Sequence, residues 1–275
     1  MKFQMAMLVF RKDWREVSRN WQVILPIVII PFMFSVLLPI IIVLVPSLAG
    51  TLGSSSGSIE EMIKNLPSSI RDQLIGMTPE QILVYVMSLY FLAPFFLIIP
   101  LMASSVIASD SFAGEKERKT IEALLATPIS DSELFLGKIL VSFIPSMLAT
   151  IVSFIIYSTV IDIVSLAIFN GRLLLPNVVW IMLIFGLAPT IALAGIGLTV
   201  IISAKVKGFR EAQQISAILL IPILALVFGQ VTGAIIFGPT LVAALIGSFV
   251  VIDLSVFMIG VRIFKREEIL SKLSS

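Results

Sequence analysis

The sequence contains no cysteine and no histidine. Without cysteine, the chain has no disulfides, thiol nucleophiles or thiolate metal ligands. Without histidine, it cannot form a His-Glu-x-x-His zinc site or a Ser-His-Asp triad, and most transition-metal sites lose their usual ligand. Any chemistry must therefore use carboxylates, hydroxyls or the active site of a partner, and we expect no metal site.

Charge is also scarce, because Asp, Glu, Lys and Arg make up 13% of the 275 residues, against about a quarter in soluble domains. Hydrophobic residues make up 58%. Charge-free runs cover 20–59, 81–109, 139–161, 173–204 and 212–252, and a spanning helix needs about 20 apolar residues. The composition predicts an all-α integral membrane protein. The net charge of +2 gives no reason to expect nucleic acid as a partner.

We expect six transmembrane helices. The final apolar stretch, 212–261, would form a helix of about 75 Å, which exceeds a hydrocarbon core of about 30 Å. It must therefore fold back, and the glycines and proline of 228–239 provide the reversal. The expected spans cover 22–45, 81–108, 130–161, 178–203, 213–231 and 240–261.

Two of these spans begin with clear capping signals. Thr78 can cap a helix whose first residue is Pro79, and Gln81 can complete a capping box. The sequence Ser-Asp-Ser-Glu from Ser130 to Glu133 has the same form. Both patterns indicate a helix that starts sharply after a polar segment.

The distribution of basic residues predicts the orientation. Six spans place both termini on one side, and that side would hold sixteen of the nineteen lysines and arginines. Basic residues concentrate in cytoplasmic segments. We therefore expect a multi-pass protein of the plasma membrane with cytoplasmic termini, an extracellular loop at 46–80 and a cytoplasmic loop at 110–138.

The N-terminal segment, 1–20, predicts an amphipathic helix. Its apolar residues recur every three or four positions, at Phe3, Met7, Phe10, Trp14 and Val17. Such a helix lies in the membrane interface with its basic residues toward headgroups. The apolar run that follows is far longer than the roughly 7 to 15 residues of a signal peptide, so the segment is interpreted as retained, ahead of a six-span domain at 21–275.

The loop at 110–138 contains an island of charge. Residues 112–138, FAGEKERKTIEALLATPISDSELFLGK, resemble the cytoplasmic segment of ABC-2-type permeases, the transmembrane subunits of ABC transporters. The positions that match the family pattern are Glu115, Glu117, Thr120, Glu122, Leu124, Leu125, Thr127, Pro128, Ile129, Ser130, Glu133, Gly137 and Lys138. Lys119 departs from it, because the family usually has glycine there. The two ends of the chain are similar as well, most of all to NatB-like permeases.

The resemblance implies an exporter in which two six-span permease subunits, identical or paralogous, form the pathway above two separate ATPase subunits. This chain would then be no enzyme and would bind no cofactor, because ATP and Mg bind to the partner ATPase. Gly137 and Lys138 do not form a P-loop, since Ser132 stands where that motif has its first glycine. The cargo stays open among sodium, lipid, peptide and drug.

The resemblance also implies that the island is a coupling helix, near 114–126, that docks into the ATPase. The predicted docking residues are Glu115, Glu117, Arg118, Lys119 and Glu122, with Leu124 and Leu125 packing against the partner or the bundle. The alternative is an ordinary solvated loop.

Asp162 lies at the outer end of the third predicted span and Asp253 lies within the sixth, and intramembrane acids are costly enough to suggest function. Both are predicted for a substrate or ion path. Asp162 is also explained by a position near the outer membrane surface, and Asp253 by a structural hydrogen bond. One alternative function is an ion-coupled secondary transporter that uses Asp253. Another is an intramembrane aspartyl protease, which the absence of flanking glycines disfavours.

Overall fold

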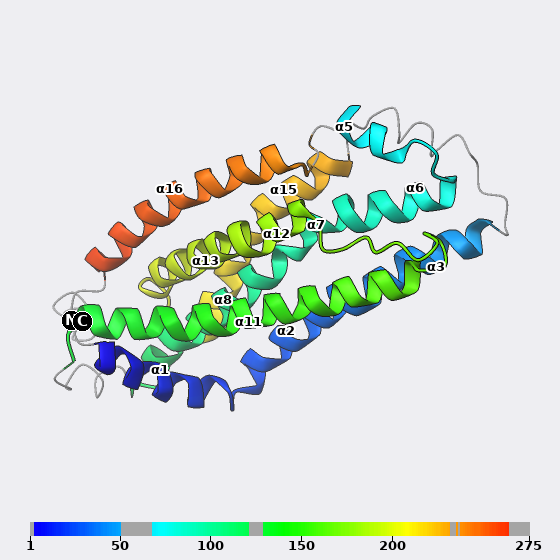
Figure 1. Ribbon diagram of the computed structural model, residues 1–275. Coiled ribbons are helices and arrows are strands. Elements are labelled where there is room, and N and C mark those ends of the chain that lie inside the picture. The colour runs from blue at the N-terminus through cyan, green and yellow to red at the C-terminus, as the bar shows by residue number, and fades with distance from the viewer. Residues whose placement is uncertain (1–2, 51–67, 121–128, 232–234, 236, 264–275) are drawn as a thin grey trace.

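The computed structural model describes residues 3–50, 68–120, 129–231, 235 and 237–263 of the chain. Within these ranges every regular element is helical, and six helical stretches are long and apolar enough to cross a membrane. They run alongside one another as an elongated bundle (Figure 1). The prediction of an all-α integral membrane protein with six spans is confirmed.

The spans lie close to their predicted ranges, at Trp21–Leu44, Pro79–Glu117, Ser132–Ser165, Val178–Ser203, Phe209–Gln230 and Pro239–Met258. Several consist of more than one element because π-helical or 3₁₀ turns interrupt them. In chain order the elements are α1 (Phe3–Val17), α2 (Trp21–Phe32), η1 (Met33–Leu37), α3 (Leu38–Gly50), α5 (Ser68–Arg71), η2 (Asp72–Leu74), α6 (Pro79–Val86), η3 (Met87–Phe91), α7 (Leu92–Phe96), α8 (Ile98–Ser109), η4 (Asp110–Gly114), α9 (Glu115–Glu117), α11 (Asp131–Ser165), α12 (Val178–Met182), η5 (Leu183–Leu187), α13 (Ala188–Ser203), α14 (Phe209–Ser216), η6 (Ala217–Leu219), α15 (Leu220–Val231) and α16 (Pro239–Ile263).

Both predicted capping boxes are present. The Gln81 N–H donates to the Thr78 hydroxyl at 3.3 Å, and the Thr78 N–H donates to the Gln81 side chain at 2.9 Å. Ser130 and Glu133 form the same pair of bonds at 3.4 and 3.2 Å. These bonds satisfy N–H groups that a helix start leaves free, and so they fix where α6 and α11 begin.

The second span ends later than the sequence predicts. We expect it to stop near Ala108, where the charges begin, but the helix continues through η4 and α9 to Glu117. This extension buries the carboxylates of Asp110 and Glu115. The burial is tolerated because basic side chains pair with both acids, and periodicity alone does not reveal such pairing.

The centre of the bundle is an aromatic core. Tyr157 on α11 and Trp180 on α12 are fully buried, and their rings stack with centroids 4.7 Å apart. Phe96 packs edge-on against Trp180 with centroids 5.2 Å apart, and Phe154 stacks on Trp180 with centroids 5.7 Å apart. These contacts hold the second, third and fourth spans together within the membrane.

Three consecutive backbone carbonyls of η3 accept hydrogen bonds from side chains of other spans. The donor–acceptor pairs are Tyr157 with Ser88, Trp180 with Leu89 and Gln230 with Tyr90, at 2.6, 3.0 and 2.6 Å. We call these six residues the carbonyl hub. The side chains satisfy backbone groups in an irregular helical turn, which lipid could not do.

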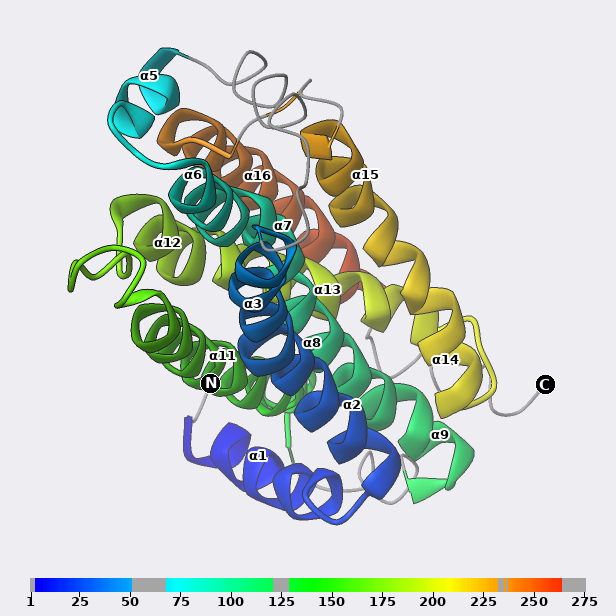
Figure 2. The same cartoon turned by 90° about the vertical axis from the view of Figure 1, so that its right-hand side faces the viewer.

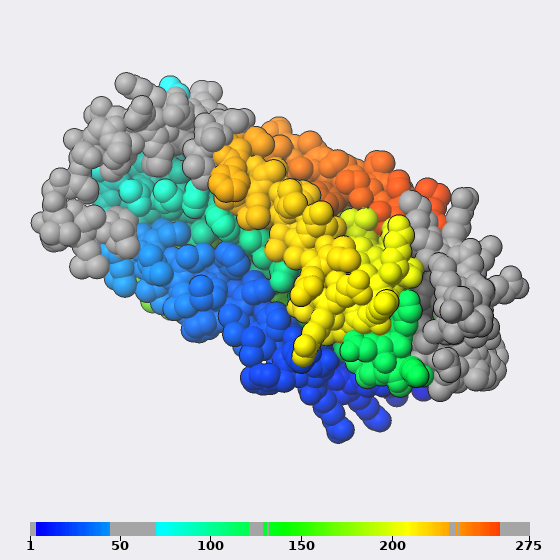
Figure 3. All heavy atoms as spheres, turned by 180° about the vertical axis from the view of Figure 1, so that it is seen from behind, coloured from blue at the N-terminus to red at the C-terminus, as the bar shows by residue number. Residues whose placement is uncertain are grey.

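The perimeter of the bundle is apolar. In Figure 2, α8 lies among the other spans, whereas α15 and α16 lie toward the outside. The view from behind (Figure 3) shows α15 and the first span on the same face, with part of the second span between them. Large side chains such as Phe228, Val251 and Leu254 are more than half exposed there. Their exposure suits contact with lipid rather than water.

Candidate functional site

Helix α1 packs across the start of α11 at one end of the bundle, which we call the α1 end (Figure 2). Its buried stripe consists of Ala6, Val9, Asp13 and Val17. Gly137 on α11 permits the close approach, because a Cβ atom there would lie 2.7 Å from both Ala6 O and Val9 Cβ. The N-terminal helix is thus held tightly against the third span.

This buried stripe differs from the apolar stripe that the sequence pattern indicates. Trp14 belongs to the expected apolar face but is 42% exposed, whereas Asp13 is buried. The close contact at Gly137 favours small side chains, and a lysine of α11 pairs with the acid. The larger apolar residues on the outward side are left for the interfacial contact predicted from the sequence.

Lys138 lies at the centre of a buried ion network. Its ammonium group is fully buried and bonds to Glu115 Oε2 at 2.6 Å and Asp13 Oδ2 at 3.2 Å. It also donates to the carbonyl and hydroxyl oxygens of Ser111, and the Ser111 hydroxyl donates to Asp13 at 2.8 Å. Lys12 pairs with the remaining oxygens of Asp13 and Glu115. We call these five residues the anchor network, which joins α1, the second span and α11.

A second ion pair lies beside the anchor network. Arg118 Nη1 bonds to the buried Asp110 Oδ1 at 2.9 Å, and Asn20 donates to the same oxygen at 3.1 Å. The other guanidinium nitrogen lies 3.6 Å from Glu16 on α1. Arg118 therefore links the second span to α1 a second time, nearer to the surface.

Burial and neighbouring charges act in opposite directions on the pKa values at this site. Burial alone would raise the pKa of Asp13, but Lys138, Lys12 and the Ser111 hydroxyl outweigh it and hold that pKa below its ordinary value. Burial alone would lower the pKa of Lys12, but the carboxylates of Asp13 and Glu115 outweigh it and raise that pKa. The geometry thus favours the charged forms of both groups.

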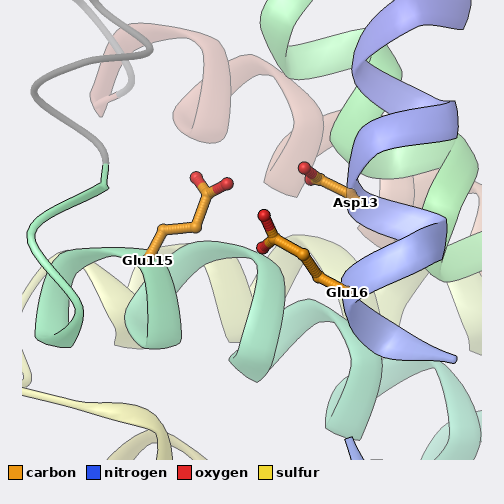
Figure 4. A group of neighbouring side chains, drawn as sticks. All are labelled: Asp13, Glu16 and Glu115. Atoms are coloured by element: carbon orange, nitrogen blue, oxygen red, sulfur yellow. The ribbon is translucent and has the colours of Figure 1, made fainter. Parts of the chain in front are cut away.

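The carboxylates of Asp13, Glu16 and Glu115 converge, with oxygens within 4.8 Å of one another (Figure 4). Such a group of acids is a pattern that metal sites share. Here, however, Lys12 bonds to all three carboxylates and Lys138 to two of them. The ammonium groups supply the positive charge that an ion would bring, so we interpret the three acids as ion-pair partners.

Helix α9 also holds the loop between the fourth and fifth spans. Glu117 accepts a hydrogen bond from the Phe209 N–H at 2.9 Å, and Lys116 donates to Val206 O at 3.0 Å. Gly208 makes room for this contact, because a Cβ atom there would lie 2.5 Å from Glu117 Oε2. A displacement of α9 would therefore reach α14 as well as α1 and α11.

Lys119 has a left-handed backbone, with φ of 58°. Glycine adopts this conformation without the steric cost that a side chain imposes. The ABC-2 pattern usually has glycine here, so the structure gives a physical reason for that glycine, which Lys119 replaces.

The predicted coupling residues have different surroundings. Glu115 is buried in the anchor network, whereas Glu117, Arg118 and Lys119 are exposed. Glu122, Leu124 and Leu125 lie outside the described residues. The docking role of all seven stays a prediction.

Asp162 lies near the end of α11 and is nearly buried. Its Oδ1 accepts hydrogen bonds from the backbone N–H groups of Leu174 at 2.8 Å and Leu175 at 3.1 Å. Such bonds hold the segment before α12 against α11. This arrangement accounts for the acid by a structural role, and its place on a substrate path stays a prediction.

Asp253 lies on α16 and lines a cavity between α11, α13 and α16. Its Oδ1 is buried and has no hydrogen-bond partner among the residues that the structure describes. The structural hydrogen bond expected for this acid is thus not found for that oxygen. The Asp162 carboxylate thus accepts two backbone hydrogen bonds, whereas Asp253 Oδ1 accepts none from the described residues.

The family profile described as "ABC-2 family transporter protein" matches residues 7–269. The chain belongs to this family. A comparison with curated proteins finds no match. The resemblance inferred from the charged island is confirmed at the level of the family, and this ABC-2 chain is a multi-pass permease subunit of an ABC transporter system.

Sequence reasoning missed part of the site in this ABC-2 permease. Asp13, Asp110 and Ser111 were not singled out, and Lys138 was named as a family-pattern position and to exclude a P-loop, with no ion-pair role. The sequence does contain a signal for the burial of two of these charges, because Asp110 and Lys138 stand directly at the edges of charge-free runs. Charges at such edges are close enough to the bundle to be drawn into it when a partner of opposite sign is near.

Proposed function

We propose that this ABC-2 permease exports its cargo with energy from ATP hydrolysed by a separate ATPase, and that the α1 end receives the movement of that partner. The anchor network carries the proposal. It ties the motif residue Glu115 to α1 and α11 through buried ion pairs. A segment that receives force must be joined firmly to the helices that it moves.

In this proposal, the α1 end faces the cytoplasm and both termini lie there. The concentration of sixteen basic residues on one side supports this orientation. Two permease subunits, identical or paralogous, form the pathway in the plasma membrane. Two ATPase subunits bind ATP and Mg beneath them.

The proposed docking surface contains Glu122, Leu124 and Leu125, with the exposed Glu117, Arg118 and Lys119 beside it. Glu115 has a different role, because its carboxylate is already engaged inside the protein. We assign it as a positioning residue that passes the movement inward.

Closure of the ATPase pair on nucleotide would displace the docked segment. The bond from Glu115 to Lys138 transmits that displacement to α11, and the bond from Glu117 to Phe209 transmits it to α14. The third and fifth spans would then reorient relative to the second and change access to the pathway. A ligand-linked shift between two states is sufficient for this cycle.

Co-purification with the ATPase tests the proposal. We expect Glu122→Lys, or Leu124→Asp with Leu125→Asp, to lower recovery of the partner at least tenfold while membrane insertion stays normal. Glu80→Lys is the matched control, because Glu80 is exposed at the opposite end of the bundle. Unchanged recovery with the island variants would overturn the docking proposal.

The alternative, an ion-coupled secondary transporter, is favoured by one observation, the unpartnered Asp253 carboxylate oxygen inside the bundle. Transport in sealed vesicles separates the two functions. The exporter requires the ATPase and ATP and needs no ion gradient, whereas the secondary transporter works from a gradient with the permease alone.

A further inference from the structure

A cavity of about 200 Å³ lies between α11, α13 and α16. Its wall is formed by Phe135, Ile139, Leu193, Ile196, Gly197, Asp253, Leu254, Val256 and Phe257. Eight of these nine residues are apolar, and Asp253 is the one charged residue among them. The cavity therefore combines a single negative charge with a hydrocarbon lining.

The charge of Asp253 has no counterion in the part of the chain that the structure describes. Asp253 takes part in none of the ion pairs found among those residues. A carboxylate within the membrane is costly unless it meets a compensating charge. A cation that enters the cavity would supply the compensating charge.

The lining indicates what kind of cation would fit. A small inorganic ion needs several oxygen ligands, and this wall offers only one carboxylate. The rings of Phe135 and Phe257 lie 5.9 Å apart beside it, and aromatic faces attract organic cations. The chemistry therefore matches an ammonium group attached to an apolar body.

The cavity also lies where an amphiphile could reach it from the bilayer. Leu254 and Phe257 border it and are 61% and 53% exposed on the outer side of α16. Phe135 is only four residues after the start of α11 at Asp131, which places the cavity in the half of the bundle nearer the α1 end. The tail of a ligand would lie along the exposed face of α16.

We propose that this cavity binds the cationic group of a lipophilic organic cation, with Asp253 as its counterion. The proposal rests on the export function above and names the class of its cargo. The volume accommodates a head group rather than a whole drug-sized molecule, since sites for those hold roughly 300–1,000 Å³.

Equilibrium binding to the purified full-length permease, in nanodiscs without ATPase, tests the proposal. The probe is tritiated dodecyltrimethylammonium, with binding to empty nanodiscs subtracted. We expect saturable binding that Asp253→Asn weakens at least tenfold and Asp253→Glu largely preserves. Phe257→Leu should weaken it about threefold, in line with the loss of one cation–π contact. Ser255→Ala is the matched control on the same helix, because its hydroxyl bonds to Val251 O.

Three results would overturn the proposal: equal affinity in Asp253→Asn, equally tight saturable binding of uncharged dodecanol, or displacement of the probe by an equimolar sodium salt. If the elution profile and melting temperature show that Asp253→Asn does not fold, the binding affinities of Asp253→Glu and Phe257→Leu test the proposal instead. The proposal then requires the first to bind and the second to bind more weakly. Binding is measured without the ATPase. A negative binding result therefore leaves the co-purification result valid, and a negative co-purification result leaves the binding result valid.

Discussion

The anchor network and the carbonyl hub both join three or more elements, but they use opposite chemistry. The anchor network pairs buried charges of α1, the second span and α11. The hub uses neutral side-chain donors from three spans on the backbone of η3. Loss of one member leaves an unpaired charge in the first case and an unpaired dipole in the second.

This difference indicates that the anchor network is the more rigid region and that the carbonyl hub can rearrange more easily. Breaking a buried ion pair costs about 3–5 kcal/mol because a charge is left without its partner. A hydrogen bond between membrane helices contributes on average about 0.6 kcal/mol and at most about 1.7. We therefore expect the α1 end to move as one unit and the hub to permit rearrangement of the spans around it.

The largest expected effect is that of Lys138→Met. It leaves the carboxylates of Asp13 and Glu115 buried with only Lys12 as a partner, and we expect a loss of about 3–5 kcal/mol in stability. Thermal unfolding of the purified permease measures it. The double variant Lys138→Met with Glu115→Gln should recover part of the loss, because it removes one of the uncompensated charges. A small effect of Lys138→Met would refute the comparison between the two regions.

A smaller effect is expected at the hub. Tyr157→Phe removes the hydroxyl that donates to Ser88 O and should lower stability by about 1 kcal/mol, measured in the same unfolding assay. Tyr85→Phe is the control, because its hydroxyl bonds to the side chain of Gln73 at an exposed position. If Tyr157→Phe lowers stability as much as Lys138→Met does, the carbonyl hub and the anchor network do not differ in strength.

Acid should release α1 before it affects the hub. The pKa of Asp13 is lowered in the folded protein, so its contribution to stability is complete above the unfolded pKa of about 4. It is lost as pH falls through the folded value. A spin label at Leu8→Cys, a position 56% exposed on α1, should become more mobile below about pH 4. Near-ultraviolet circular dichroism of the aromatic core should change later, and simultaneous changes would argue against separate regions.

The pKa of Lys12 is raised in the folded protein, so its contribution to stability is lost as pH rises, whereas that of Asp13 is lost as pH falls. Its contribution is complete below the unfolded pKa of about 10.4 and is lost as pH rises through the folded value. The same label at Leu8 should therefore stay immobile between these two limits.

The smallest expected effect is that of Lys119→Gly. The left-handed backbone at this position disfavours a side chain, so glycine should stabilise the turn by about 1 kcal/mol. Hydrogen exchange of the adjacent α9 amides should slow slightly. Glycine at the half-buried Lys116, in the helical part of α9, is the control and should speed that exchange.

The sequence predicts the spans well because their signals are local. The length of each apolar run predicts a spanning helix. Two of the helices begin at a capping box, formed by Thr78 with Gln81 and by Ser130 with Glu133. The pair Asn170–Gly171 forms a turn in which both residues have positive φ, a conformation that asparagine and glycine tolerate best. Local pattern was enough for these features.

The site depends on contacts between distant residues, and here prediction from sequence was partial. The motif identified Glu115 and its neighbours, but the partners of Glu115, Lys12 and Lys138, lie 103 and 23 positions away. The face of α1 that packs against the bundle was not predicted, because Gly137 and Lys138 of α11 select its small and acidic residues. No periodicity within α1 contains that information.

Distances between spin labels during the ATPase cycle test the central claim most directly. The chain has no cysteine to remove, and Leu8, Ser132 and Ile75 are exposed positions on α1, on α11 and at the opposite end of the bundle. With the ATPase reconstituted, the distances from Ile75 to Leu8 and from Ile75 to Ser132 should change together when a non-hydrolysable ATP analogue replaces ADP. A change at Ser132 with none at Leu8 would contradict the claim that the anchor network moves as one unit.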